Sequence, residues 1–139
     1  MDGVGYGAPA SVGAALANRD LGRFSVSIQS DGDLMYAPGV LWTAAHHDLP
    51  IVFVILANRE YRVLKHNIDA YRMRFGIKSN APYMHMDLSG PTMGFVEMAK
   101  GMGVPGTHVT KADDIKAAVT AAFATGKPHL IEIEIEGKR

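Results

Sequence analysis

The sequence has 139 residues, enough for one domain with a buried core and too few for two. Hydrophobic residues make up 47% of the chain and charged residues 20%, so we expect a packed globular domain and not a disordered one. The 14 basic and 14 acidic side chains cancel, which excludes long-range attraction to nucleic acid or to an anionic membrane surface.

Neither cysteine nor a long apolar segment is present in the chain. Without cysteine there is no disulfide framework and no thiolate metal site, so we expect a cytoplasmic location. The longest apolar run, residues 51–57, is far shorter than the roughly 20 residues that cross a bilayer. No signal peptide is visible at the N-terminus. We therefore expect no contact with a membrane.

Helices and strands are expected to alternate along the first half of the chain. Residues 8–18 are rich in alanine and favour a helix. Apolar and polar residues alternate over 24–29, which predicts a strand, and residues 30–33 form the turn that ends it. A second helix is predicted over 38–47. The continuous apolar run at 51–56 is typical of a central strand that is covered on both faces.

The second half of the chain continues this alternation after a weaker stretch. Residues 62–86 predict a short helix followed by a long irregular segment. A helix over 91–101, a strand over 103–109 and a helix over 110–125 follow, and residues 130–135 form a strand with one polar, glutamate-bearing face. The pattern predicts an α/β fold, a three-layer open sheet of mostly parallel strands with helices on both faces.

Two oxygen-bearing side chains stand where predicted strands end. Asp31 follows the first strand and Asn58 follows the central strand. In an open parallel sheet such ends meet at one edge, where ligands bind. Mg²⁺ prefers oxygen ligands and is often held by one or two protein oxygens together with phosphates. Asp-Gly after a strand is frequently only a turn, so the pairing of Asp31 with Asn58 carries this hypothesis.

The motifs around these residues resemble a known family. Asp31-Gly32-Asp33 followed by Asn58 is similar to the cofactor motif of thiamine-diphosphate enzymes, in particular benzoylformate decarboxylase and acetolactate synthase relatives. The glycine-rich residues 3–10, residues 41–45 and the closing residues 128–133 also match their patterns. The resemblance covers essentially the whole chain and implies a single pyrophosphate-binding domain over residues 1–139.

The resemblance assigns roles to individual residues. Asp31 and Asn58 would bind Mg²⁺ through their side chains, and Glu60 through its backbone oxygen. The diphosphate would be lined by Gly32, Asp33 and the amides of Tyr61 and Arg62, and Val4 would lie under the thiazolium ring. The cofactors implied are thiamine diphosphate and Mg²⁺. Such a cofactor carries the difficult step itself, because its ring takes up the electron pair that decarboxylation of a 2-keto acid releases.

Several residues depart from the family pattern. Ser30 replaces a glycine, Ala57 replaces an asparagine, and Arg59-Glu60 stand where small or polar residues are common. Asp33 adds a second carboxylate beside the diphosphate, which is repulsive unless cations offset it. The nearby cations Arg59, Arg62 and Lys65 are expected to do so.

The expected function is that of the cofactor-binding domain of a 2-keto acid decarboxylase or carboligase. The family completes its active site with a pyrimidine-binding domain that supplies a glutamate, and no segment of this chain matches that domain. We therefore expect the C-terminal part of a larger enzyme, inactive in isolation and active within a homo-oligomer. Two alternatives stay open: a non-catalytic α/β oligomerisation module that has lost cofactor binding, and an unrelated phosphate-binding α/β domain.

Overall fold

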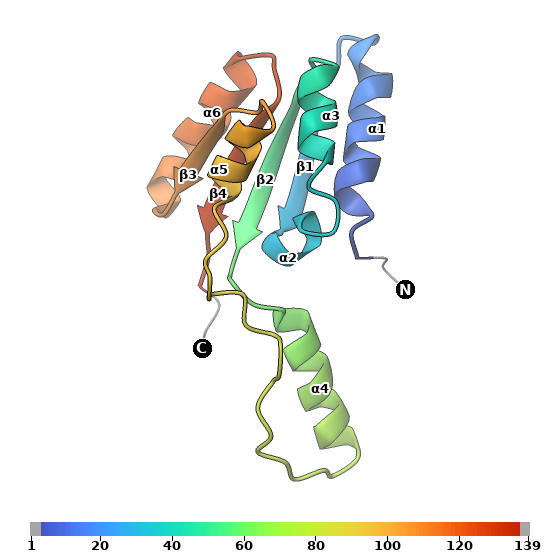
Figure 1. Cartoon of the computed structure of the whole chain (residues 1–139), viewed down its shortest axis with the longest axis vertical. Coiled ribbons are helices and arrows are strands. Elements are labelled where there is room, and N and C mark those ends of the chain that lie inside the picture. The colour runs from blue at the N-terminus through green and yellow to red at the C-terminus, as the bar shows by residue number, and fades with distance from the viewer. Residues whose placement is uncertain (1–3, 137–139) are drawn as a thin grey trace.

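The computed structural model describes residues 4–136 and consists of a parallel sheet flanked by helices (Figure 1). Gly3, which belongs to the predicted glycine-rich motif, lies outside the described residues. The elements in chain order are α1 (Gly7–Arg19), β1 (Ser25–Ser30), α2 (Asp31–Leu34), α3 (Val40–His46), β2 (Ile51–Ala57), α4 (Arg62–Arg74), α5 (Phe95–Gly101), β3 (Gly106–Val109), the 3-10 turn η1 (Ala112–Asp114), α6 (Ile115–Ala124) and β4 (His129–Glu134).

The strands lie in the order β1-β2-β4-β3, and all three pairings between them are parallel. Ser30 lies opposite Leu56, and Ala57 lies opposite Glu134, so β1, β2 and β4 end at the same edge. Figure 1 shows the arrowheads of these strands pointing toward α2 and α4. The predicted parallel α/β sheet is confirmed, and its carboxyl edge carries both residues that the sequence singled out.

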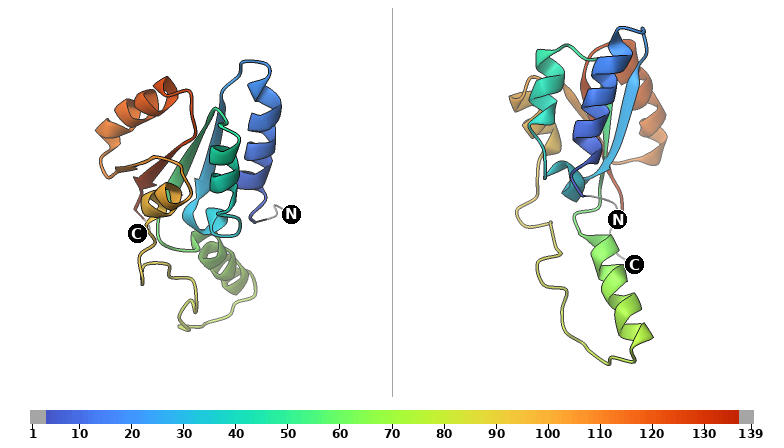
Figure 2. Two further views of the ribbon diagram at one scale, coloured as in Figure 1. Left: turned by 45° about the horizontal axis from the view of Figure 1, so that its top comes forward. Right: turned by 90° about the vertical axis from the view of Figure 1, so that its right-hand side faces the viewer.

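Helices cover both faces of the sheet, with α1, α3 and α5 on one face and α6 on the other (Figure 2). Successive side chains of β2 enter opposite cores. Phe53 packs in the core under α1, α3 and α5, and Val52 packs with Ala122 of α6. This double burial explains why residues 51–56 read as a continuous apolar run. The sheet is therefore the middle of three layers, as predicted.

Strand β1 buries its polar face and exposes its apolar face, the opposite of what alternating strands usually do. Its polar residues Ser25, Ser27 and Gln29 are buried, whereas Val26 is 48% and Ile28 is 65% exposed. The buried polar groups are satisfied locally, because Gln29 Nε2 donates to Ser27 Oγ at 3.0 Å. Period-two alternation thus located the strand, but the face that meets α1 is the polar one.

Strand β4 corrects another expectation. The sequence predicted one polar, glutamate-bearing face, yet Glu132 is only 3% exposed. The reason is that helices pack on both faces of β4, with α5 against one face and α6 against the other, so a residue on either face is covered. Only Glu134, at the end of the strand, is exposed.

Two segments differ from their predicted form. Residues 30–33 were expected as a turn, but Ser30 ends β1 and residues 31–33 begin the short helix α2, whose first turn Ser30 caps by accepting from the Asp33 amide at 3.3 Å. The helix predicted to be short after residue 62 is α4, with 13 residues, none of them buried. It projects from the sheet as an arm, and the irregular segment returns beside it (Figures 1 and 2). Among residues 4–136, no helix is long and apolar enough to cross a membrane.

Candidate functional site

Asp31 is the buried centre of the carboxyl edge. It opens α2 directly after β1 and is 1% exposed. Its Oδ1 accepts from the Gly32 amide at 2.8 Å, and its Oδ2 accepts from the Arg59 amide at 2.7 Å. The second bond joins the end of β1 to the turn that follows β2. The structure therefore brings Asp31 next to Asn58, as the sequence predicted.

The turn after β2 is held on both sides. Asn58 Oδ1 accepts from the Glu60 amide at 3.0 Å, and Arg59 adopts a left-handed conformation with φ of 58°. The Leu88 amide donates to the Arg59 carbonyl at 2.8 Å, so the returning segment lies along the turn. Each carboxylate or amide oxygen keeps a further lone pair after these bonds, so Asp31 and Asn58 can still serve a cation.

The Glu60 carboxylate pairs with basic side chains and is not available to a metal. The side chain is 9% exposed, forms an ion pair with Lys65 and lies 3.9 Å from the Arg62 Nε. With its carboxylate engaged by two cations, its backbone carbonyl is the oxygen left for the metal role assigned to this residue. That role stays a prediction.

The ring of Tyr61 lies directly over Gly32. A Cβ placed on Gly32 would stand 2.5 Å from Tyr61 Cε1, so a glycine is required there by the ring itself. Burial, followed by the neighbouring Tyr36 and Asp31, raises the pKa of Tyr61 above its ordinary value of 10.0. The hydroxyl is therefore neutral at physiological pH. The Tyr61 ring thus occupies the space that a side chain at position 32 would take, and the diphosphate-lining role that the resemblance assigns to Gly32 stays a prediction.

Asp33 fastens the glycine-rich segment to the same edge. Its Oδ1 accepts from the Gly5 amide at 2.6 Å, and the adjacent Val4 is 63% exposed. Val4 is thus accessible, as a platform for a cofactor ring must be. The cations expected to offset Asp33 are engaged elsewhere: Arg59 pairs with Glu132, and Arg62 and Lys65 pair with Glu60.

The two amides predicted to line a diphosphate differ in availability. The Tyr61 amide donates to the Met86 carbonyl at 3.0 Å. Arg62 is the first residue of α4, and helix geometry provides no acceptor within the helix for its amide. Its side chain donates to the Glu136 carbonyl at 3.1 Å. The first turn of α4 therefore offers the Arg62 amide more readily than that of Tyr61.

Sequence reasoning missed the ion pair between the partly buried Arg59 and the buried Glu132. The Arg59 side chain is 17% exposed and that of Glu132 is 4% exposed. Arg59 had been read as a cation facing Asp33, and Glu132 as part of a polar face. The available signal was the pair Leu130-Ile131, because two consecutive apolar residues indicate a strand covered on both faces.

The chemistry of this edge favours a hard cation that brings its own anionic ligands. Within the described part of the chain, no group of three or more His, Cys, Asp or Glu side chains could hold a metal. Asp31 and Asn58 offer one carboxylate and one amide oxygen, which is the usual protein share of a Mg²⁺ shell that phosphates complete. The donor set therefore fits magnesium diphosphate.

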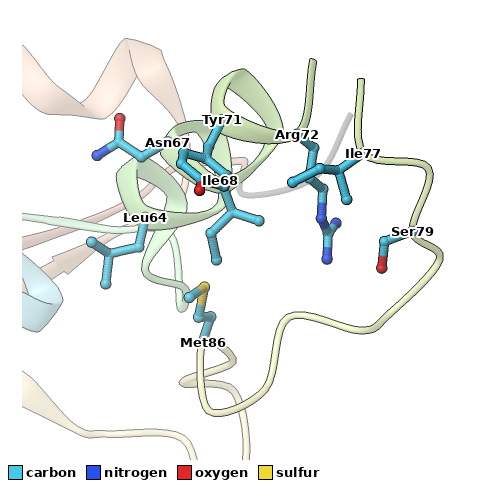
Figure 3. Close-up of a pocket in the computed structure, with 8 residues that line it drawn as sticks. All are labelled: Leu64, Asn67, Ile68, Tyr71, Arg72, Ile77, Ser79 and Met86. Carbon is cyan, nitrogen blue, oxygen red and sulfur yellow. The ribbon is translucent and has the colours of Figure 1, made fainter. Parts of the chain in front are cut away.

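A separate groove of about 430 Å³ lies along the arm. It is mainly apolar, and Figure 3 shows Met86 of the returning segment and Ile68 of α4 facing one another across it. The residues that line it are Leu64, Asn67, Ile68, Tyr71, Arg72, Ile77, Ser79 and Met86.

Comparison with known proteins gives the family. Residues 1–133 match the family described as thiamine pyrophosphate enzyme, C-terminal TPP binding domain. The chain belongs to this family. As a TPP-binding domain it is 40% identical, over 95% of its length, to "Putative acetolactate synthase large subunit IlvX" of Mycobacterium tuberculosis. It is 34% identical, over 94% of its length, to benzoylformate decarboxylase of Pseudomonas aeruginosa.

Solved structures agree with these relatives. The TPP-binding domain superposes on the thiamine diphosphate-dependent 4-hydroxybenzoylformate decarboxylase of Rhodococcus jostii RHA1 with a TM-score of 0.81 and 33% identity, over 97% of this chain. The chain spans only about a quarter of its relatives' length: 25% of the M. tuberculosis protein, 23% of the P. aeruginosa enzyme and 24% of the R. jostii chain. Because the chain belongs to this family, the alternative of an unrelated phosphate-binding α/β domain is excluded.

Proposed function

We propose that this domain binds the diphosphate of thiamine diphosphate through Mg²⁺. Asp31 and Asn58 would hold the metal with their side chains, and Glu60 with its backbone carbonyl. Gly32, Asp33 and the amides of Tyr61 and Arg62 would line the diphosphate, and Val4 would support the thiazolium ring. The observation that carries this proposal is the 2.7 Å hydrogen bond from the Arg59 amide to Asp31 Oδ2, which unites the two strand ends.

We further propose that the domain serves a 2-keto acid decarboxylase or carboligase. The support is its similarity to benzoylformate decarboxylase and to the named acetolactate synthase subunit. When bound, thiamine diphosphate supplies an electron sink for the pair released by decarboxylation. The chain's own part is to anchor the diphosphate and fix the orientation of the ring. A pyrimidine-binding domain would complete the site, within a cytoplasmic homo-oligomer.

Calorimetric titration tests the binding proposal. The chain is titrated with thiamine diphosphate and Mg²⁺, alone and with a pyrimidine-binding domain supplied as a separate protein. We expect binding that requires Mg²⁺ and is lost in Asp31→Ala, because removal of the carboxylate deletes a metal ligand. Binding that persists unchanged in Asp31→Ala would refute the assigned metal site.

One observation favours a second candidate, the non-catalytic oligomerisation module. The exposed Val26 and Ile28 form an apolar face on β1 that suits association with another protein surface. If the chain oligomerises through β1 but binds no thiamine diphosphate even with the pyrimidine-binding domain present, this second function is the correct one.

A further inference from the structure

Arg59 is held in a conformation that its residue type disfavours. Its φ of 58° lies in the left-handed region, where glycine is favoured and a residue with a Cβ is strained. Its amide donates to Asp31 Oδ2 at 2.7 Å, and its carbonyl accepts from the Leu88 amide at 2.8 Å. These two backbone hydrogen bonds support the strained conformation, and the contacts of the side chain add to them.

The guanidinium makes three contacts beyond the turn. It forms the ion pair with the buried Glu132 and donates to the Met93 carbonyl at 2.8 Å. It also lies 5.6 Å from the centroid of the Phe95 ring. These partners come from β4 and from α5 with the segment before it, on the far side of the turn from Asp31. The side chain thus links the end of β2 to an interior strand and to α5.

The two members of the ion pair depend on each other. Glu132 is buried in an interior strand, and a buried carboxylate without a cation is strongly unfavourable. Its charge therefore holds the guanidinium in place. The guanidinium in turn holds residue 59 in the left-handed region, which sets the turn from Asn58 to Glu60.

We propose that Arg59 and Glu132 are a positioning pair for the Mg²⁺ ligands. Neither side chain would be a ligand of the metal; together they would hold the turn that carries Asn58 and Glu60 against Asp31, where the Arg59 amide donates to Oδ2. The inference deepens the proposed function and rests on it. Loss of the pair lets residue 59 leave the left-handed region, and the Arg59 amide then leaves Asp31.

The test measures Mg²⁺ binding to the full chain at a fixed, saturating concentration of thiamine diphosphate, with the pyrimidine-binding domain present. We expect Glu132→Gln and Arg59→Ala, which removes the guanidinium but keeps the strained Cβ, to raise the Mg²⁺ concentration for half-saturation by about tenfold or more, as the loss of a group that orients metal ligands typically does. Glu134→Gln is the matched control, because Glu134 stands two residues along β4 and pairs with His108 instead. It should leave half-saturation unchanged.

A second readout needs no cofactor. In the free chain, hydrogen exchange at the Arg59 and Leu88 amides should accelerate in Glu132→Gln, whereas the amides of β2 keep their protection. Wild-type exchange at both amides in this variant would overturn the positioning role, since a pair that merely stabilises the core moves all amides together.

A double variant keeps the test decisive if single variants fold poorly. Arg59→Ala with Glu132→Leu removes both charges and keeps a Cβ at residue 59, so no unpaired charge is buried while the left-handed conformation stays strained. We expect it to fold and to show the same weakened Mg²⁺ binding; wild-type Mg²⁺ affinity would overturn the proposal. Failure of the proposed function and failure of the positioning pair give different results. If the wild-type chain binds no magnesium thiamine diphosphate, both proposals are overturned. If binding is lost in Asp31→Ala but intact in Glu132→Gln, only the positioning pair is overturned.

Discussion

Gly32 and Tyr61 form a steric contact that decides which residues can occupy the start of α2. A Cβ on Gly32 would lie 2.5 Å from the Tyr61 ring, too close for ordinary packing. Alanine is a better helix former than glycine by up to about 1 kcal/mol, whereas overpacking costs about 1–3 kcal/mol. Because the contact is so short, crowding outweighs helix propensity.

We therefore predict that Gly32→Ala lowers the free energy of unfolding by about 1–3 kcal/mol in urea titrations. In a Tyr61→Ala background the same change should be neutral or stabilising, because the ring that it meets is gone. Equal effects in both backgrounds would show that Tyr61 does not determine the need for glycine.

His129 provides a pH-dependent contribution to stability. Burial lowers its pKa below the ordinary 6.5, its Nδ1 is buried with no hydrogen-bond partner among the described residues, and its Nε2 lies 3.0 Å from Thr107 Oγ1. The unfolded chain therefore binds the proton more readily than the folded one. Stability is complete above the unfolded pKa and falls as the pH drops through 6.5 toward the lower folded value.

We predict that the free energy of unfolding decreases between about pH 7 and pH 5, and that His129→Gln flattens this part of the profile. Denaturant titrations at a series of pH values measure the slope. His66→Gln, on the exposed side of α4, is the control and should leave it unchanged. A slope that survives in His129→Gln would assign the pH dependence to another group.

Helix α4 differs from the other α-helices of residues 4–136 because it has no buried residue. Its apolar side chains Leu64, Ile68 and Tyr71 face a groove shared with the returning segment and not the sheet. Few buried contacts permit local opening without unfolding of the rest of the molecule.

We predict that native-state hydrogen exchange of the α4 amides is faster than that of β2, and that Ile68→Gly accelerates exchange in α4 alone. Glycine removes both the apolar contact with the returning segment and helix propensity. The midpoint of global thermal unfolding should stay at its wild-type value. A parallel loss of protection in β2 would show that the arm unfolds together with the sheet.

Sequence patterns predicted elements well where a single local rule decides them. The central strand and its double burial followed from an uninterrupted apolar run, and Asp31 and Asn58 were placed by the rule that parallel strands end at one edge. The burial of Glu132 and the exposure of Ile28 could not be predicted in this way. Both depend on which parts of each face the helices cover, and the placement of helices on the sheet is not encoded in local periodicity.

At the scale of the whole molecule, β1 leaves both an edge and part of one face of the sheet uncovered. No strand pairs with the outer side of β1 among residues 4–136, and Val26 and Ile28 are exposed on the face that α6 leaves open. An open edge with apolar side chains promotes association.

We predict that Val26→Thr with Ile28→Thr reduces concentration-dependent self-association in sedimentation experiments. The free energy of unfolding should change by less than about 0.5 kcal/mol, because threonine keeps the β-branched shape and these side chains are not in the core. Leu21→Thr, at an exposed turn, is the control for a general loss of surface hydrophobicity. Unchanged association in the double variant would place the contact elsewhere.

The ion pair between Arg59 and Glu132 also limits which substitutions these two positions can accept during evolution. Loss of either charge alone strands the other in the interior at a cost of about 3–5 kcal/mol, whereas replacement of both by apolar residues is close to neutral. The two positions are therefore epistatic: each single step passes through a destabilised intermediate, although both end states are viable. Lineages should carry both charges or neither, and glycine at position 59 should accompany an uncharged residue at position 132.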